Sequence, residues 1–177
     1  MGEQLTISPA SSRGAGAVIS PCKRYRYRLW RGAEPGRQAI FVGCNPSTAG
    51  ASHDDATVRK FRGFTARWGC TGFEMLNACA YRARHPRDLL TVDDPVGPDN
   101  REAFDAAFFE ARRWAEPLVV VGWGSALPKP LRHHAETALG WLEALGGELH
   151  CLGVTKGGQP RHPLMLSYST ALERFDG

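Results

Sequence analysis

The sequence contains no C-x-x-C pair, and its cysteines are odd in number. There are five, at Cys22, Cys44, Cys70, Cys79 and Cys151. This argues against a disulfide framework and against a zinc or iron–sulfur site, because both usually need paired or closely spaced cysteines. His133 and His134 are adjacent on a predicted helix and should point about 100° apart, so they should not share one ion. We predict neither a metal nor another cofactor.

Long apolar runs are also missing. No run approaches the ~20 residues that span a bilayer, and the 42% hydrophobic and 23% charged content is typical of soluble globular proteins. Residues 1–20 are rich in Gly, Ala and Ser but lack the basic start and continuous apolar stretch of a signal peptide. We therefore expect a disordered leader over 1–22, one domain over 23–177, no membrane partner, and the cytoplasm as the default location. The oligomeric state is left open.

The basic stretch "CKRYRYRLWR" carries part of the net charge of +4. Arginine and lysine alternate here with tyrosine and tryptophan. One interpretation is an edge strand with a solvated basic face. The other is a surface that faces nucleic acid, in which Arg24, Arg26 and Arg28 contact phosphates, since cations pair with phosphates and aromatic rings stack on bases.

Apolar runs alternate with segments of helical spacing in the rest of the chain. "QAIFVG", "GFEMLN" and "PLVVVGW" are continuous apolar runs, as a sheet covered on both faces requires, and "GELHCLG" is a weaker one. Residues 54–68, 99–114 and 129–147 each place apolar side chains along one helical stripe. Because such alternation implies right-handed crossovers, we predict an α/β fold: a three-layer α/β/α sandwich with a mainly parallel central sheet.

Four loops leave these runs at what should be one edge of the sheet. They are "GCNPSTA", "NACAYR", "GWGSA" and "TKGGQPRHPL", each rich in Gly, Asn, Ser or His. Ligands of parallel sheets collect where the carboxyl ends of the strands open into loops. We therefore expect the functional site where these loops converge.

Taken in this order, the segments resemble the uracil-DNA glycosylase superfamily. The similarity is carried by Gly43-Cys44-Asn45-Pro46-Ser47, by "LVVVGWGSA" over 118–126, by "MLNACAYRARHP" and by His162-Pro163-Leu164. More closely, "YRYRLWR", "NPSTA", "DDATVRKF", "DPVGPDN" and "HPL" together resemble an uncharacterised bacterial family, the domain of unknown function DUF1643.

The superfamily resemblance implies a nucleobase-recognising protein of glycosylase-like fold that hydrolyses an N-glycosidic bond. Asn45 would orient the attacking water while Pro46 fixes the loop. His162 would donate a hydrogen bond to the carbonyl oxygen of the departing pyrimidine, and Asn77 would face the base edge. The remaining residues expected around the base are Gly43, Cys44, Ser47, Trp123 and Gly124.

The chain departs from the superfamily pattern at two points. No carboxylate stands at Asn45, so a general base is missing there; Asp54 or Asp55, with Asp55 favoured, could substitute, and either could instead cap a helix. The loop after His162 reads "HPLMLSYS", so Leu164 or Met165 would be the apolar residue that fills the vacated base stack.

Two alternatives to a glycosylase remain. The first is a module that binds a nucleotide or nucleic acid without catalysis, which keeps Asn77 and His162 meaningful without a catalytic base. The second is a cysteine-dependent hydrolase in which Cys44 is the nucleophile and His53 or His162 its base. For the glycosylase and for the binding module, the expected partner is nucleic acid or a nucleotide.

Overall fold

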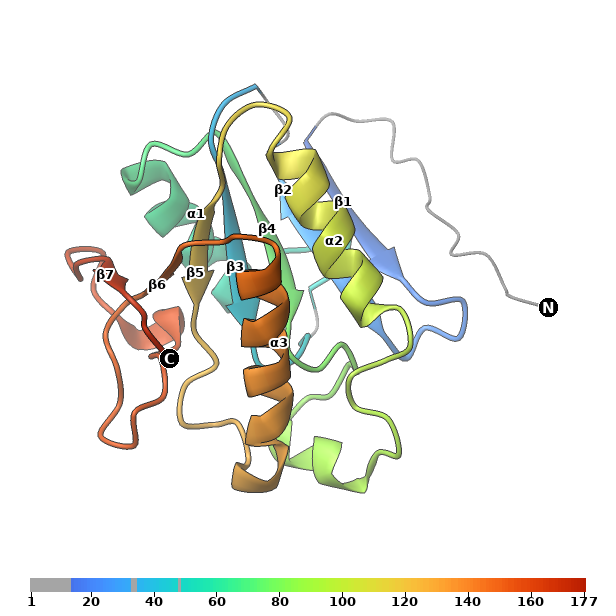
Figure 1. Cartoon of the computed structure of the whole chain (residues 1–177). Helices are drawn as coiled ribbons and strands as arrows, with labels where there is room; N and C mark the ends of the chain where they lie inside the picture. The colour runs from blue at the N-terminus through green and yellow to red at the C-terminus, as the bar shows by residue number, and fades with distance from the viewer. Residues whose placement is uncertain (1–13, 33–34, 48) are drawn as a thin grey trace.

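The computed structural model describes residues 14–32, 35–47 and 49–177, whose strands form one seven-stranded sheet (Figure 1). Within these residues, no helix is both long enough and apolar enough to cross a membrane. The strands are β1 (Ala15–Ile19), β2 (Arg26–Arg31), β3 (Gln38–Gly43), β4 (Gly72–Asn77), β5 (Leu118–Val121), β6 (Leu149–Cys151) and β7 (Glu173–Arg174). The α-helices are α1 (Ala56–Arg67), α2 (Asn100–Ala111) and α3 (Arg132–Ala144), and the short 3-10 helices are η1 (Pro86–Thr91), η2 (Lys129–Leu131) and η3 (Pro163–Met165).

The sheet is mixed, in the order β1-β2-β4-β3-β5-β6-β7. The neighbours β4, β3, β5 and β6 run parallel, whereas β1, β2 and β7 each pair antiparallel. The α/β class is confirmed, but the prediction of a mainly parallel sheet is wrong. The four parallel strands are those expected from apolar runs, while the antiparallel ones are short or carry charged residues.

Strand β1 lies inside the segment expected to be a disordered leader. It pairs antiparallel with β2, so the ordered domain begins before residue 23; residues 1–13 of the expected leader lie outside the described residues. Because β1 occupies the edge of the sheet, β2 lies between β1 and β4. The interpretation of this segment as an edge strand with a solvated basic face is therefore wrong.

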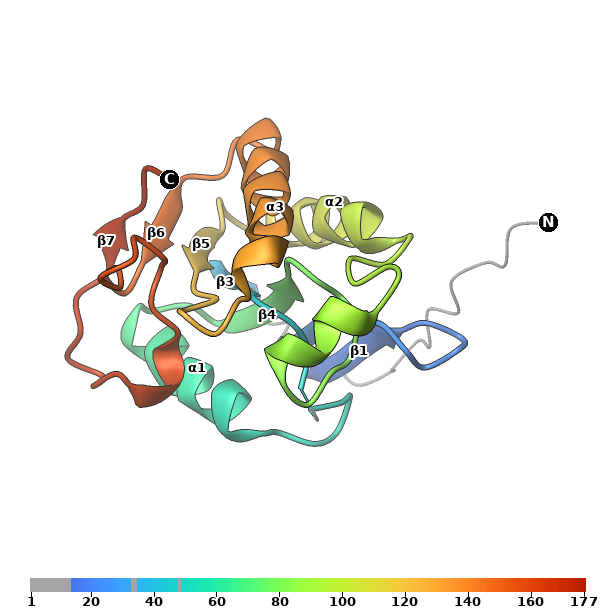
Figure 2. The ribbon, with the colours of Figure 1, turned by 90° about the horizontal axis from the view of Figure 1, so that it is seen from below.

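Side chains of β3 alternate between two apolar cores. Ile40 packs on one face with Phe104 and Leu142, which come from α2 and α3. Phe41 packs on the other face against Phe61 of α1, with ring centroids 4.7 Å apart. Figure 2 shows α1 on one side of the sheet and α2 and α3 on the other. Full burial of each such side chain contributes about 1.5–3 kcal/mol, which holds the helices on the sheet.

The helices that follow β3 and β5 leave the sheet on opposite sides. Strand β3 continues into α1, whereas β5 continues through η2 into α3 on the other face. Neighbouring parallel strands whose connections diverge in this way leave a crevice beyond their carboxyl ends. The topology therefore opens space where the four loops of interest emerge.

Candidate functional site

A cavity of about 490 Å³, here called the first cavity, lies at the carboxyl ends of β3, β4 and β5. Each of the four loops contributes to its wall, with Asn45, Asn77, Trp123 and His162 as one member from each. Of the residues predicted for the site, the wall contains Arg26, Gly43, Cys44, Asn45, Ser47, Asp55, Asn77, Trp123, Gly124, His162, Leu164 and Met165. The loops thus bring together side chains that are far apart in the sequence.

The Asn45 side chain is held by two backbone carbonyls. Its Nδ2 donates to the Pro46 oxygen at 3.0 Å and to the Ala83 oxygen at 2.9 Å. An amide nitrogen has two hydrogens, and both are used here. What Asn45 offers to a ligand or a water in the cavity is therefore its oxygen, an acceptor.

Asn77 presents an unused donor. The residue is 4% exposed, and its Nδ2 is buried without a hydrogen-bond partner among the described residues. A buried polar group left unpaired costs about 1–3 kcal/mol. Gly43 stands beside it, because a Cβ there would lie 3.1 Å from Asn77 Oδ1. Because Gly43 has no side chain, a ligand can come close to the Asn77 amide and accept a hydrogen bond from its Nδ2.

His162 is fixed as a neutral hydrogen-bond donor. Its Nδ1 accepts a hydrogen bond from the Leu164 backbone N–H at 3.3 Å, so in the neutral ring the hydrogen lies on Nε2. Burial lowers the pKa of His162, against a smaller opposing effect of Asp55. Phe41 contacts the imidazole edge-on, with centroids 6.2 Å apart. At neutral pH the cavity therefore meets an Nε2–H.

Trp123 and Gly124 shape the wall rather than offer polar groups. The Trp123 indole is 3% exposed and its Nε1 donates to Gln159 Oε1 at 2.9 Å. Gly124 has φ +68, and a Cβ there would lie 3.1 Å from the Cβ of His162. Glycine is needed at this position for both reasons, the backbone conformation and the close approach of His162.

Asp55 is the N-cap of α1. Its Oδ1 accepts from the Val58 backbone N–H at 2.9 Å, and its Oδ2 is hydrogen-bonded to the Ser47 hydroxyl. Both carboxylate oxygens thus have partners, and the capping role considered from the sequence is present. Pro46 is buried beside this turn and lies outside the wall of the first cavity.

Cys44 is a buried thiol in the cavity wall. Burial raises its pKa to about 12, with a further contribution from Cys79. A thiol of this kind stays protonated at neutral pH and is a poor nucleophile. His53 does not line the cavity, and the Nδ1 of His162 is already engaged. The geometry therefore does not favour the cysteine-dependent alternative.

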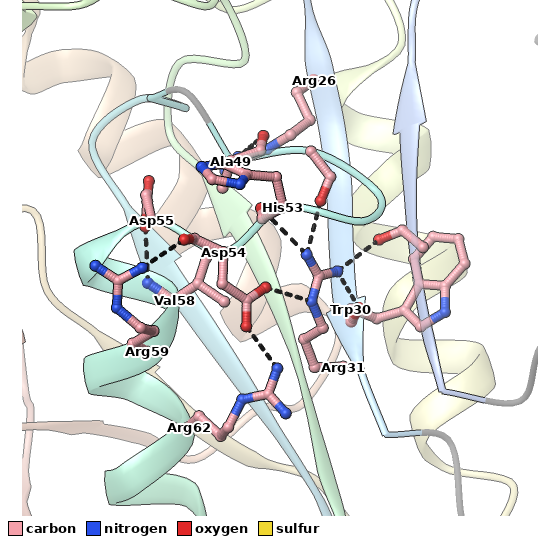
Figure 3. A network of polar contacts seen from close by, with 12 residues as sticks. Arg26, Trp30, Arg31, Ala49, His53, Asp54, Asp55, Val58, Arg59 and Arg62 are labelled. Carbon is pink, nitrogen blue, oxygen red and sulfur yellow. Dashed lines mark hydrogen bonds and ion pairs between the residues drawn. The ribbon is translucent and has the colours of Figure 1, made fainter.

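Two arginines of β2 hold the segment between β3 and α1 in place (Figure 3). Arg26 Nη1 donates to the Ala49 oxygen at 2.8 Å, and Arg31 Nε donates to Asp54 Oδ1 at 2.7 Å. Arg62 of α1 binds the other Asp54 oxygen at 2.6 Å. Partial burial works to raise the pKa of Asp54, but the hydrogen bonds from Arg31 and Arg62 hold it below its ordinary value. The network fixes the loop that delivers Asp55 to the cavity.

The arginines of β2 do not form a solvated basic face. Arg24, which precedes β2, is exposed and lies outside the wall of the first cavity. Arg26 is 3% exposed and faces the first cavity. Arg28 is buried and paired with Glu74 and Glu110. The predicted contact of Arg28 with a phosphate does not fit this arrangement, because its charge is already matched inside the protein.

Residues 26–164 match the family model described as "Protein of unknown function (DUF1643)". The chain belongs to the DUF1643 family. No curated protein and no solved structure matches it significantly. The family-level prediction is thus confirmed, and the match extends over the four loops through Leu164. The wider resemblance to uracil-DNA glycosylases stays a prediction for this DUF1643 protein.

Sequence reasoning missed several side chains of the cavity wall. Phe41 lies in the cavity wall and contacts the His162 ring. The sequence could have indicated this position, because alternation along β3 puts Phe41 on the same face as Gly43. Arg84 and Arg161 also line the cavity. Arg84 lies within "MLNACAYRARHP" and Arg161 within the loop "TKGGQPRHPL", but neither side chain formed part of a recognisable pattern.

The adjacent histidines of α3 lie closer together than expected. The ring centroids of His133 and His134 are 3.9 Å apart, so the prediction that they point apart is wrong; rotation of their side chains brings the rings together. In the described part of the chain, no group of three or more His, Cys, Asp or Glu side chains is arranged to hold a metal ion.

Proposed function

We propose that this protein binds a nucleobase in the first cavity and hydrolyses the N-glycosidic bond of the nucleotide that carries it. The observation that carries the proposal is the set of polar groups on the cavity wall that the described residues leave without a partner. Asn45 offers an oxygen, Asn77 offers a buried N–H that has no partner among the described residues, and His162 offers an Nε2–H. A base edge with adjacent carbonyl and N–H groups is complementary to such a set.

The reaction uses these groups in different ways. Asn77 recognises the base in its ground state. His162 donates to the base carbonyl on which negative charge grows, because the bond between the sugar carbon and the base nitrogen breaks with both electrons leaving on the base. Asn45 accepts a hydrogen bond from the water whose oxygen bonds to that sugar carbon. The proton released by the water ends on the departing base.

The fold proposal is a three-layer α/β/α sandwich of the uracil-DNA glycosylase type. The parallel strands β4, β3, β5 and β6, with helices on both faces, support it. The partner proposed is nucleic acid, in the cytoplasm, from which the nucleotide is turned out before reaction. Leu164 and Met165, 37% and 89% exposed beside His162 on η3, have the position needed to fill the space left in the stack. Arg24 remains the exposed arginine proposed to contact phosphate.

The proposal is tested by base release from DNA oligonucleotides that carry uracil, hypoxanthine or modified pyrimidines. On the substrate identified, His162→Ala should slow single-turnover release by ~10²-fold or more and leave equilibrium binding nearly unchanged, since the charge that it stabilises develops only in the transition state. Asn45→Ala should behave similarly, because positioning a water affects hydrolysis more than affinity. If no substrate releases a base with the unaltered protein, catalysis is abandoned.

A non-catalytic binding module is the second candidate. It is favoured by one observation, that both oxygens of Asp55 are engaged in capping and in the bond to Ser47, so the residue suggested as a base is already occupied. In that case His162→Ala and Asn45→Ala should both weaken equilibrium binding, and no base should be released.

A further inference from the structure

Arg26 is a buried cation with few hydrogen-bond partners among the residues that the structure describes. It is 3% exposed and lines the first cavity. Within the described residues its guanidinium makes one hydrogen bond, from Nη1 to the Ala49 oxygen, and its Nε is buried without a partner. Burial lowers the pKa of Arg26 to about 10, with partial compensation from Asp55. A guanidinium has five N–H donors, so its bond to Ala49 accounts for only part of them.

A second cavity, of about 850 Å³, adjoins the first on this side. The two share wall residues that include Ser47, Asp55 and Arg84. Lys23 and Arg82 complete the basic side of the second cavity. The region where the two cavities meet therefore lies between the buried arginine and an open basic surface.

Arg82 repeats the pattern of Arg26. Its Nη1 donates to the Lys23 oxygen at 3.2 Å, and its Nε is buried without a partner in the described part of the chain. Arg82 and Arg26 are near enough for their charges to repel. Holding two like charges together without a ligand is unfavourable, and an anion between them would relieve it.

The carboxylate at this junction is already engaged in hydrogen bonds within the protein. Among the described residues that line either cavity, Asp55 is the single carboxylate, and it accepts from Ser47 and Val58. The cationic side chains of the same walls outnumber it; they are Lys23, Arg26, Arg82, Arg84 and Arg161. An anion that approaches the junction is attracted overall.

We propose that a phosphate group of the ligand binds where the two cavities meet, held by Arg26, Arg82 and Arg84. The proposal rests on the proposed function for the base, and it names the substrate class as a nucleotide or a nucleic-acid strand rather than a free base or nucleoside. The base lies against Asn77 and His162, and its phosphate lies toward Arg26. Guanidinium groups suit this role because their paired N–H donors match two phosphate oxygens.

Calorimetry with four probes tests the phosphate site directly. Inorganic phosphate, deoxyuridine, deoxyuridine monophosphate and a uracil-containing oligonucleotide are titrated into the full chain. We expect phosphate to bind and the monophosphate or the oligonucleotide to bind at least tenfold more tightly than the nucleoside. Tighter binding by the oligonucleotide identifies a phosphodiester strand, and tighter binding by the monophosphate identifies a free nucleotide. Equal affinity for nucleoside and nucleotide, or no binding by any phosphate-bearing probe, overturns the proposal.

Variants assign the effect to the arginines. Arg26→Met should weaken binding of the phosphate-bearing probes roughly 10- to 100-fold, and Arg82→Met or Arg84→Met roughly tenfold, with little change for the nucleoside. Arg37→Met is the matched control, because Arg37 precedes the amino end of β3, whereas the cavities lie beyond its carboxyl end. Should Arg26→Met not fold, the Arg82 and Arg84 variants still decide. Unchanged phosphate affinity in them contradicts the proposal.

The outcomes separate this inference from the glycosylase proposal. Phosphate binding that depends on the arginines, without base release from any substrate, supports the phosphate site and removes the proposed reaction. Base release that is equally fast from nucleoside and nucleotide, and insensitive to Arg82→Met and Arg84→Met, supports the reaction and removes the phosphate site.

Discussion

Two arginines on one strand, Arg26 and Arg28, are both buried, yet their charges are treated differently. Arg28 donates to Glu74 through Nε and Nη2 and to Glu110 through Nη1 and Nη2, the last at 2.7 Å. Within the described part of the chain, Arg26 donates to one carbonyl oxygen, and it faces the first cavity. Burial alone therefore does not distinguish a structural arginine from a functional one. The count of partners does, because a charge left open at a cavity wall has a use only when something binds there.

Arg28, the arginine with acidic partners, is expected to contribute to the free energy of unfolding. Arg28→Met should lower the free energy of unfolding by about 3–5 kcal/mol, because it leaves Glu74 buried without its partner. Urea unfolding followed by circular dichroism measures the change. Arg37→Met, which removes an exposed arginine at the other edge of the sheet, should change it by less than about 0.5 kcal/mol. A loss below about 1 kcal/mol in Arg28→Met would contradict this prediction, because Arg28 would then contribute no more to stability than is expected of Arg26.

Arg31, the third arginine of β2, resembles Arg28 because it also has an acidic partner, Asp54. Asp54→Asn should cost about 1.5 kcal/mol, since it removes the charge that receives the hydrogen bonds from Arg31 and Arg62. The pKa of Asp54 lies below its ordinary value of about 3.9, so its contribution is present above that value and is lost as pH falls through the lowered pKa. Unfolding curves of the two proteins should converge in acid; a constant gap would contradict this.

The smallest expected effect concerns the protonation of His162 in the wall of the first cavity. Titration of its ring by NMR should give a pKa below the ordinary value of about 6.5, because burial disfavours the charged form. Stability from the neutral ring should therefore be present above about pH 6.5 and fall as pH drops toward the lowered pKa. The neutral ring should carry its hydrogen on Nε2. A raised pKa, or a hydrogen on Nδ1, would break the assignment of His162 as a neutral donor.

The parallel strands and the convergence of the four loops at one cavity were predictable from local pattern. "QAIFVG" is a continuous apolar run followed directly by Cys-Asn-Pro, so both β3 and the loop with Asn45 follow from neighbouring residues. Asn77 is likewise placed by the end of β4. Because carboxyl ends of parallel strands lie at one edge, short-range signals were enough to bring these side chains together.

The antiparallel strands and the arginine environments were not predictable in this way. Strand β1, "AGAVI", is short and small, and it exists because β2 pairs with it. The alternation in "RYRYRLW" indicates an exposed face, but Glu74 and Glu110, far away in the sequence, allow Arg28 to be buried. Whether a basic residue is solvated or paired depends on long-range partners that periodicity does not report.

The most direct test of the central claim compares the unfolding free energies of Arg26→Met and Arg28→Met in phosphate-free buffer. Methionine preserves much of the side-chain volume in both. If Arg26 is kept open for a ligand, Arg26→Met should change stability by no more than about 1 kcal/mol or even stabilise the protein, because it removes a buried, incompletely paired cation. Arg28→Met should lose about 3–5 kcal/mol. Equal and large losses in both variants would contradict the account, because they would mean that the hydrogen bond to Ala49 is enough to explain why Arg26 is buried.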